Sequence, residues 1–154
     1  MSLVPYPLNL STKEKGAGKT FKFSSFGETK NILYQDLLEI MESHRRFVEN
    51  GYFFILDSRV VRMQGLDEAY PKILTKDKIE AILSGSANYM EFYRSCNDSQ
   101  KKIIVNMIVD KLFEDEDSLD LNMVDKISRE SGVKIQDRVS DLRESVLAES
   151  KNKK

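Results

Sequence analysis

The chain has 154 residues, 40% hydrophobic and 32% charged, a composition that suits one well-charged globular domain and argues against a disordered chain. Lys and Arg total 24 and Asp and Glu total 25, so no global charge draws the protein to nucleic acid or to an anionic membrane. A single cysteine excludes an internal disulfide, and the N-terminus lacks a secretory pattern, so we expect a reducing, cytoplasmic location. The longest apolar stretch, 103–109, is too short to span a bilayer.

Residues 1–31 are predicted to form an extended basic arm. Pro5 and Pro7 disfavour helix in their neighbours, and residues 1–34 carry five lysines against two glutamates. Phenylalanines alternate with polar residues over 20–26, which predicts a short strand. We expect the arm to dock on a partner, for instance by adding this strand to a sheet edge. A solvated tail fits the composition equally well. The residues expected to bind the partner are Lys19, Phe21, Lys22 and Phe23.

Residues 16–20, GAGKT, match only the end of a phosphate-binding loop. Lys13 stands where the pattern GxxxxGK[ST] requires a glycine, and neither a buried strand before the segment nor a helix after it is predicted. We therefore expect a lysine-bearing segment that binds no nucleotide.

Residues 32–150 are predicted to form a single compact, mostly helical domain, followed by a polar tail over 151–154. Strand-prone runs on either side of Asp57-Ser58 predict a small β-hairpin. The fold class is therefore mainly α (α+β), a bundle of four to six helices with an extended N-terminal arm and a small β-hairpin. The predicted segments are a helix over 32–50, hairpin strands over 52–56 and 59–63, a helical turn over 66–70, and helices over 76–83, 87–96 and 99–113, before a closing helical pair.

The predicted helix over 99–113 is apolar around nearly all of its circumference. Only Lys102, Asn106 and Asp110, four residues apart, make a narrow polar stripe. Such a helix must be buried on several sides. It is either the central helix of the bundle, which a lone bundle needs, or a helix with one face against another subunit.

No residues form a recognisable catalytic or metal-binding set. Cys96 would need a nearby base to act as a nucleophile, and no motif brings it near His44, the only histidine. The same scarcity argues against a zinc site, and the acidic run 114–117 lacks the spacing of a calcium loop. We therefore expect no enzyme activity, no metal ion and no cofactor.

Residues 122–147 have the outline of a helix-turn-helix. Gly132 suits the tight turn, and apolar residues at Ile135, Val139, Leu142 and Val146 recur with helical spacing. Three cations and three acids cancel on the exposed face of the second helix, whereas a DNA reader needs cationic contacts to phosphates. An ordinary helical hairpin is therefore favoured over a DNA reader. In the second interpretation, the DNA-binding residues are Lys126, Arg129, Lys134, Gln136 and Arg138.

Together these features predict a non-enzymatic interaction or assembly protein, such as an adaptor or a component of a larger particle. It would bind a protein partner, or a second copy of itself, through the arm and the helical body. The alternative is a DNA-binding regulator that uses the segment 122–147.

Overall fold

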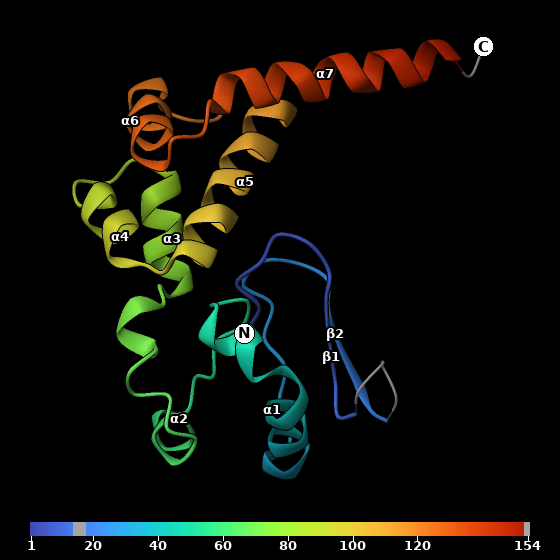
Figure 1. Cartoon of the computed structure of the whole chain (residues 1–154), viewed down its shortest axis with the longest axis vertical. Coiled ribbons are helices and arrows are strands. Elements are labelled where there is room, and N and C mark those ends of the chain that lie inside the picture. The colour runs from blue at the N-terminus through green and yellow to red at the C-terminus, as the bar shows by residue number, and fades with distance from the viewer. Residues whose placement is uncertain (14–17, 153–154) are drawn as a thin grey trace. The chain divides into compact units, whose positions relative to one another are not determined.

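The computed structural model describes residues 1–13 and 18–152. Residues 14–17, which include the first two residues of the GAGKT segment, lie outside the described part. The chain is mainly helical with one two-stranded antiparallel hairpin, which confirms the predicted fold class (Figure 1). It divides into two compact units. Unit 1 comprises Met1–Asp77 with Ser95–Gln100, and unit 2 comprises Lys78–Arg94 with Lys101–Lys154.

The hairpin of unit 1 lies near the N-terminus. Strand β1 (Leu8–Ser11) pairs antiparallel with β2 (Thr20–Phe23), in a register that places Leu8 opposite Phe23 and Leu10 opposite Phe21. The predicted strand at 20–26 is therefore present. Residues 1–13 are extended, but they are not detached from the fold, because Leu3, Val4, Leu8 and Leu10 are buried in the core of unit 1.

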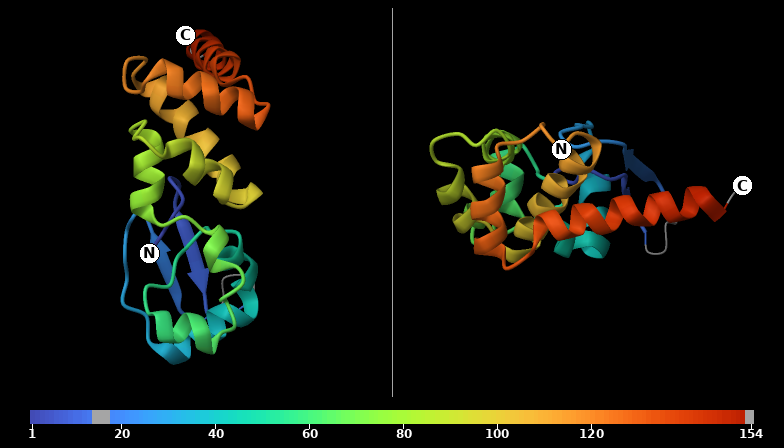
Figure 2. Two further views of the ribbon diagram at one scale, coloured as in Figure 1. Left: turned by 90° about the vertical axis from the view of Figure 1, so that its left-hand side faces the viewer. Right: turned by 90° about the horizontal axis from the view of Figure 1, so that it is seen from above.

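Helix α1 (Tyr34–Glu49) lies against β1 in unit 1 (Figure 2). It buries Leu37, Ile40, Met41 and Val48, which repeat with the helical period, so the predicted helix over 32–50 is confirmed. His44 has non-helical backbone angles and kinks the helix. The chain leaves α1 through Gly51, whose φ of 76° is in the left-handed region that favours glycine.

The prediction of a hairpin over 52–63 is wrong. Phe53 makes an isolated bridge with Ser2, and residues Ser58–Met63 form the helix α2. The Asp57 side chain accepts a hydrogen bond of 2.9 Å from the Arg59 N–H, so it caps this helix. The β-branched pair at 60 and 61 favours a strand locally, but the cap and the burial of Val61 select a helix. The turn predicted over 66–70 is present, because the N–H groups of Ala69 and Tyr70 donate to the Leu66 carbonyl oxygen at 3.1 and 3.0 Å. It leads directly into the 3₁₀ helix η2 (Tyr70–Lys72).

Residues 95–100 return to unit 1 and are fastened there by Gln100. This side chain is fully buried, accepts a hydrogen bond of 2.7 Å from the Leu74 N–H and donates one of 3.1 Å to the Leu74 carbonyl oxygen. Its stem also occupies the space that a Cβ at Gly51 would need, 2.6 Å away. The Gln100 amide therefore supplies hydrogen-bond partners to both backbone groups of buried Leu74, as a neighbouring strand would.

Unit 2 is helical throughout its described part. Its helices are α3 (Lys76–Leu83), which starts in unit 1, α4 (Tyr89–Ser95), α5 (Asp98–Glu114), whose first residues belong to unit 1, α6 (Leu121–Ser131) and α7 (Ile135–Asn152). The predicted helices over 76–83, 87–96 and 99–113 are confirmed with small shifts of their ends. Seven residues of α5 are buried between Ile103 and Leu112, as its nearly continuous apolar surface predicts.

Candidate functional site

An apolar cavity of about 400 Å³ opens on the surface of unit 1. The hairpin supplies Leu10 and Phe23 to its walls, and α1 supplies Leu37. The remaining wall is the extended segment 53–57, followed by Val60 of α2. This size falls within the range of pockets that take a small ligand or a large side chain.

Large apolar side chains are exposed at the mouth of the cavity. Leu56 lines the cavity and is 64% exposed, and Tyr34, which also lines it, is 41% exposed. Leu33 is adjacent to Tyr34, and Met63, which is 68% exposed, follows Val60 by one turn of α2. We define the cavity rim as Leu33, Tyr34, Leu56 and Met63. Exposed apolar residues gathered around a cavity are typical of interaction sites.

The charges beside the cavity are mainly cationic on α2. Arg59 forms an ion pair of 2.8 Å with Asp57. The Arg59 guanidinium holds the pKa of the Asp57 carboxyl at about 2, well below its ordinary value. Lys30 pairs with Glu28 at 2.7 Å, whereas exposed Arg62 makes no ion pair with any residue in 1–13 or 18–152. Arg62 is therefore an exposed, unpaired guanidinium on α2 that is available to a binding partner.

The phenol of Tyr70 holds the extended wall of the cavity in place. Its oxygen accepts a hydrogen bond of 2.8 Å from the Ile55 N–H and lies 3.4 Å from the Ile55 carbonyl oxygen. The Tyr70 ring packs against that of Phe54, with centroids 4.7 Å apart. Burial raises the pKa of Tyr70 to about 12. A neutral phenol thus holds the wall at 53–57 through contacts with Phe54 and Ile55.

The four predicted partner-binding residues lie in different environments. Phe23 is buried and lines the cavity, and Phe21 is half-buried. Lys19 is fixed by two hydrogen bonds, of 2.8 and 3.0 Å, to the buried carboxylate of Asp36 on α1. Lys22 is exposed. No described strand pairs with the second edge of β2, because the sheet has only two strands in the described part of the chain.

In unit 2, α6 and α7 form the predicted helix–turn–helix shape. Gly132 ends α6 with a φ of 70°, a conformation that suits glycine. The Ser128 hydroxyl donates a hydrogen bond of 2.6 Å to the Val133 carbonyl oxygen and lies 3.4 Å from the Ile135 nitrogen, so it fixes the turn from inside. Val124, Ile127, Ile135 and Val139 are buried.

The five candidate DNA-binding residues are exposed, but most of their charges are balanced locally. Arg129 pairs with Asp125 on α6, and Lys134 lies 3.6 Å from Asp137. The Lys126 ammonium lies 6.0 Å from the Tyr89 ring centroid. Arg138 lies close enough to Asp110 to lower that carboxyl's pKa, although burial and Glu114 raise it more. Gln136 borders a hollow of about 330 Å³ between α6 and α7.

The first half of α7 is packed and the second half is not. Ile135 and Val139 are buried, whereas Val146 is 52% and Leu147 is 59% exposed. The helix extends well beyond α5 and α6, on which its first half packs (Figures 1 and 2). We define the outer half of α7 as residues 141–150. Its apolar residues are Leu142, Val146 and Leu147, all exposed.

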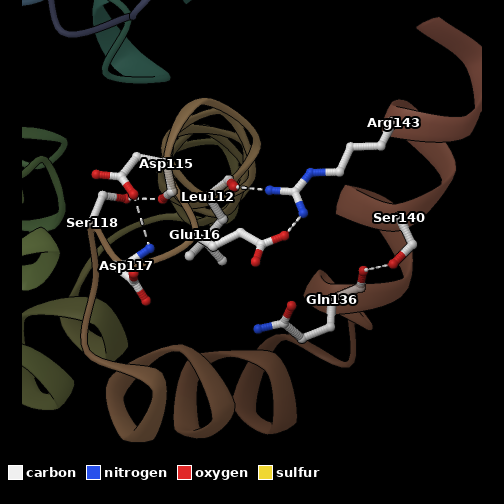
Figure 3. A network of polar contacts seen from close by, with 8 residues as sticks. All are labelled: Leu112, Asp115, Glu116, Asp117, Ser118, Gln136, Ser140 and Arg143. Atoms are coloured by element: carbon white, nitrogen blue, oxygen red, sulfur yellow. Dashed lines mark hydrogen bonds and ion pairs between the residues drawn. The ribbon is translucent and has the colours of Figure 1, made fainter. Parts of the chain in front are cut away.

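Arg143 anchors the middle of α7 to the end of α5. Its guanidinium donates a hydrogen bond of 2.7 Å to the Leu112 carbonyl oxygen and forms an ion pair with Glu116 (Figure 3). Ser118 donates to the neighbouring Lys111 carbonyl oxygen at 3.1 Å. A cation at a helix C-terminus is favourable, because the last carbonyl groups carry partial negative charge. Three serines of α7, at 140, 145 and 150, donate to carbonyl oxygens of their own helix.

The chain's histidine is not arranged as a base for a nucleophile. His44 Nε2 lies 3.3 Å from the Ser11 hydroxyl. That hydroxyl donates its proton to the Lys13 carbonyl oxygen at 2.7 Å, so it accepts from the imidazole and does not donate to it. Cys96 is a buried thiol. Nucleophilic catalysis requires the opposite hydrogen-bond direction between hydroxyl and base.

Among residues 1–13 and 18–152, no three His, Cys, Asp or Glu side chains are grouped closely enough to hold a metal ion. Within the same residues, every helix is too short or too polar to cross a membrane.

Comparison of the chain with known protein families, with characterised proteins and with solved structures finds no match. The function is therefore inferred from the geometry of each unit. The sequence did not predict the cavity rim, because its residues come from three separate segments of the chain. The signal present in the sequence is the pair of apolar residues, Leu33 and Leu56, that stand just before the starts of α1 and α2.

Proposed function

We propose that this chain is a non-enzymatic protein-binding module that holds an amphipathic helix of a protein partner at the cavity of unit 1. One observation carries the proposal: two exposed large apolar side chains, Tyr34 and Leu56, line the apolar cavity of about 400 Å³. Two more are close to lining residues in the chain, since exposed Leu33 precedes Tyr34 and exposed Met63 follows Val60 by one helical turn. Monomeric proteins rarely leave such side chains in water without a binding role. Apolar anchors that enter a pocket supply most of the free energy of binding in such contacts.

The charge beside the rim favours an acidic partner. Arg62 is exposed and makes no ion pair with the described residues, and α2 contains no acidic residue. A carboxylate on the partner would therefore meet a guanidinium that is available for pairing. Complementary charges of this kind add to the specificity and orientation of a complex more than to its affinity.

The strand β2 supports the same interaction role. Its second edge has no described strand beside it, and Phe23 joins it to the cavity wall. In this proposal Lys22 faces the partner, whereas Lys19 and Phe21 hold the hairpin against α1 and the core. The buried thiol of Cys96 is consistent with the reducing, cytoplasmic setting that we propose for the protein.

Selection from a displayed library of random peptides would test this function. We expect enriched peptides to carry two apolar residues at i and i+4 beside an acidic residue. Their binding should shift the NMR signals of Phe23, Ile55 and Val60, and it should weaken at least about tenfold in Leu56→Glu. The matched control is Leu121→Glu, since Leu121 is equally exposed but belongs to unit 2. Failure to enrich any peptide, or equal binding to Leu56→Glu, would contradict the proposal.

A second candidate function is binding of duplex DNA by α6 and α7, and the observation in its favour is the turn at Gly132 fixed by Ser128. It would use Lys126, Arg129, Lys134, Gln136 and Arg138. The pairing of Arg129 and Lys134 with neighbouring acids weakens it, because phosphate contacts need available cations. Retardation of duplex DNA at low salt, lost in Lys134→Glu with Arg138→Glu, would support it. If duplex DNA is not retarded at low salt, DNA binding by α6 and α7 is ruled out.

A further inference from the structure

We infer that the helix held at the unit 1 cavity is the outer half of α7 from a second copy of this chain. The inference rests on the proposed function, because it names the partner of the same cavity. It concerns a contact between two molecules, each of which supplies one surface. One molecule supplies the cavity rim and the other supplies residues 141–150.

The outer half of α7 has the apolar pattern that the cavity requires. Leu142 and Val146 are four residues apart and share one face of the helix, which continues the buried row of Ile135 and Val139. Leu147 widens this face and is 59% exposed. The row therefore runs without interruption from the packed half of the helix into solvent. Each surface leaves large apolar side chains in water, and the contact would cover both.

The charges of the two surfaces are complementary. Glu149 follows Val146 by three residues and lies on the same face of α7, and Asp141 precedes Leu142. Neither carboxylate forms an ion pair with a residue in the described part of the chain. The only cation in the described side chains of the outer half, Arg143, is already bound to Glu116 and to the Leu112 carbonyl oxygen. An acidic apolar helix that covers the cavity rim would extend onto α2, whose unpaired charge is Arg62.

This contact joins different surfaces of the two copies. It is therefore heterologous, and it either closes a dimer by reciprocal exchange of α7 or extends into longer assemblies. A contact of α7 with another α7 would instead use the same surface on both copies. Variants that disable one surface each can separate these two arrangements.

Molar mass by light scattering, at concentrations up to about 1 mM, tests the inference. We expect the wild-type mass to rise with concentration above the monomer value of 17.8 kDa. Leu56→Glu and Val146→Glu should each remain monomeric. An equimolar mixture of the two should associate again, because the first variant supplies an intact α7 and the second an intact cavity. Leu121→Glu is the control and should associate like the wild type, and circular dichroism should show that all variants are folded.

A charge exchange gives an independent test. Arg62→Glu or Glu149→Arg alone should weaken association about fivefold, because an attraction at an exposed site becomes a repulsion. The double variant in one chain should recover most of the loss, since it restores an opposite pair. Loss without recovery would overturn the pairing of Arg62 with Glu149.

Three outcomes overturn the inference. They are a wild-type chain that stays monomeric at every concentration, association that persists in both Leu56→Glu and Val146→Glu, and a mixture of these variants that stays monomeric. These results are distinguishable from failure of the proposed function. If library peptides still bind the wild type and not Leu56→Glu, the cavity binds a helix from another protein. If the library peptides fail to bind the wild type, or bind Leu56→Glu equally well, both the inference and the proposed function are wrong.

Discussion

Arg143 of α7 and Leu112 of α5 are joined by a hydrogen bond of 2.7 Å from the guanidinium to the carbonyl oxygen. This carbonyl belongs to the last turn of α5, where no backbone N–H within the helix is available to it. The same guanidinium holds Glu116, beyond the end of α5. One side chain therefore caps one helix and fixes the direction in which another leaves the unit.

Replacement of Arg143 should loosen the attachment of α7. We expect Arg143→Ala to lower the free energy of unfolding by about 1–2 kcal/mol, because it removes a charge-assisted hydrogen bond and exposes a helix end. Arg143→Lys keeps the charge but not the fork of donors, so its loss should be smaller. Urea unfolding followed by circular dichroism measures both. Equal stability of the alanine variant and the wild type would show that the contact contributes nothing.

Replacement of Gln100 should be more costly. Gln100→Leu leaves the buried N–H and carbonyl oxygen of Leu74 without their partner, at a cost of about 2–4 kcal/mol. The matched control is Gln64→Leu, since Gln64 makes one exposed hydrogen bond of 3.3 Å to the Tyr34 phenol. We expect that variant to lose less than about 0.5 kcal/mol. Denaturant midpoints of the two variants would show the difference directly.

The Tyr70 phenol predicts a loss of stability in alkali. Burial raises its pKa to about 12 in the folded chain, whereas the unfolded chain ionises near pH 10. The unfolded state therefore loses its proton first, and stability falls as the pH rises from about 10 to about 12. Tyr70→Phe should cost about 1 kcal/mol at neutral pH, through the hydrogen bond from Ile55, and should remove this alkaline decline. Thermal unfolding of both chains between pH 8 and 11 would test it; parallel curves would contradict it.

Asp110 predicts a smaller loss of stability with rising pH, in the acidic range instead of the alkaline one. Burial and the nearby Glu114 carboxylate raise its pKa, and Arg138 only partly offsets them. The folded state therefore binds this proton more tightly than the unfolded state, so the charged form costs stability as the pH rises above the carboxyl range. Asp110→Asn should stabilise the chain at pH 7, by less than about 1 kcal/mol because the site is partly exposed, and should give no gain at pH 3. Asp67→Asn, at an exposed position, is the control for a lost surface charge.

The helices were the most predictable part of the fold. The apolar row of α1 and the apolar circumference of α5 depend only on residues close in the sequence, so their periodicity identifies them. The segment 52–63 was mispredicted because Val60 and Val61 favour a strand locally, whereas the Asp57 cap and the burial of Val61 decide the structure. The hairpin is found instead at 8–11 and 20–23, where eight residues, and not a two-residue turn, separate the strands in the sequence.

The candidate site was less predictable than the fold. Phe23 was expected to bind a partner, and its place in the cavity wall agrees with a role near that surface. Leu56 and Met63 were assigned to strands, so their exposure was not foreseen. A cavity assembled from the hairpin, α1, the segment 53–57 and α2 depends on contacts between residues distant in sequence. Periodicity within single segments does not report such contacts.

The serine bonds along α7 have a consequence for the energetics of association. Starting a helix is costly, but extending one adds a hydrogen bond for each residue fixed. The packed half of α7 already contains the first turns of the helix, and Arg143 anchors the beginning of the outer half to α5, so the outer half needs only extension. Ser145 and Ser150 weaken that extension slightly, because each offers its own backbone an alternative hydrogen bond. Residues within α7 therefore determine the fraction of time that residues 141–150 are helical. The concentration of the binding-competent form is proportional to that fraction.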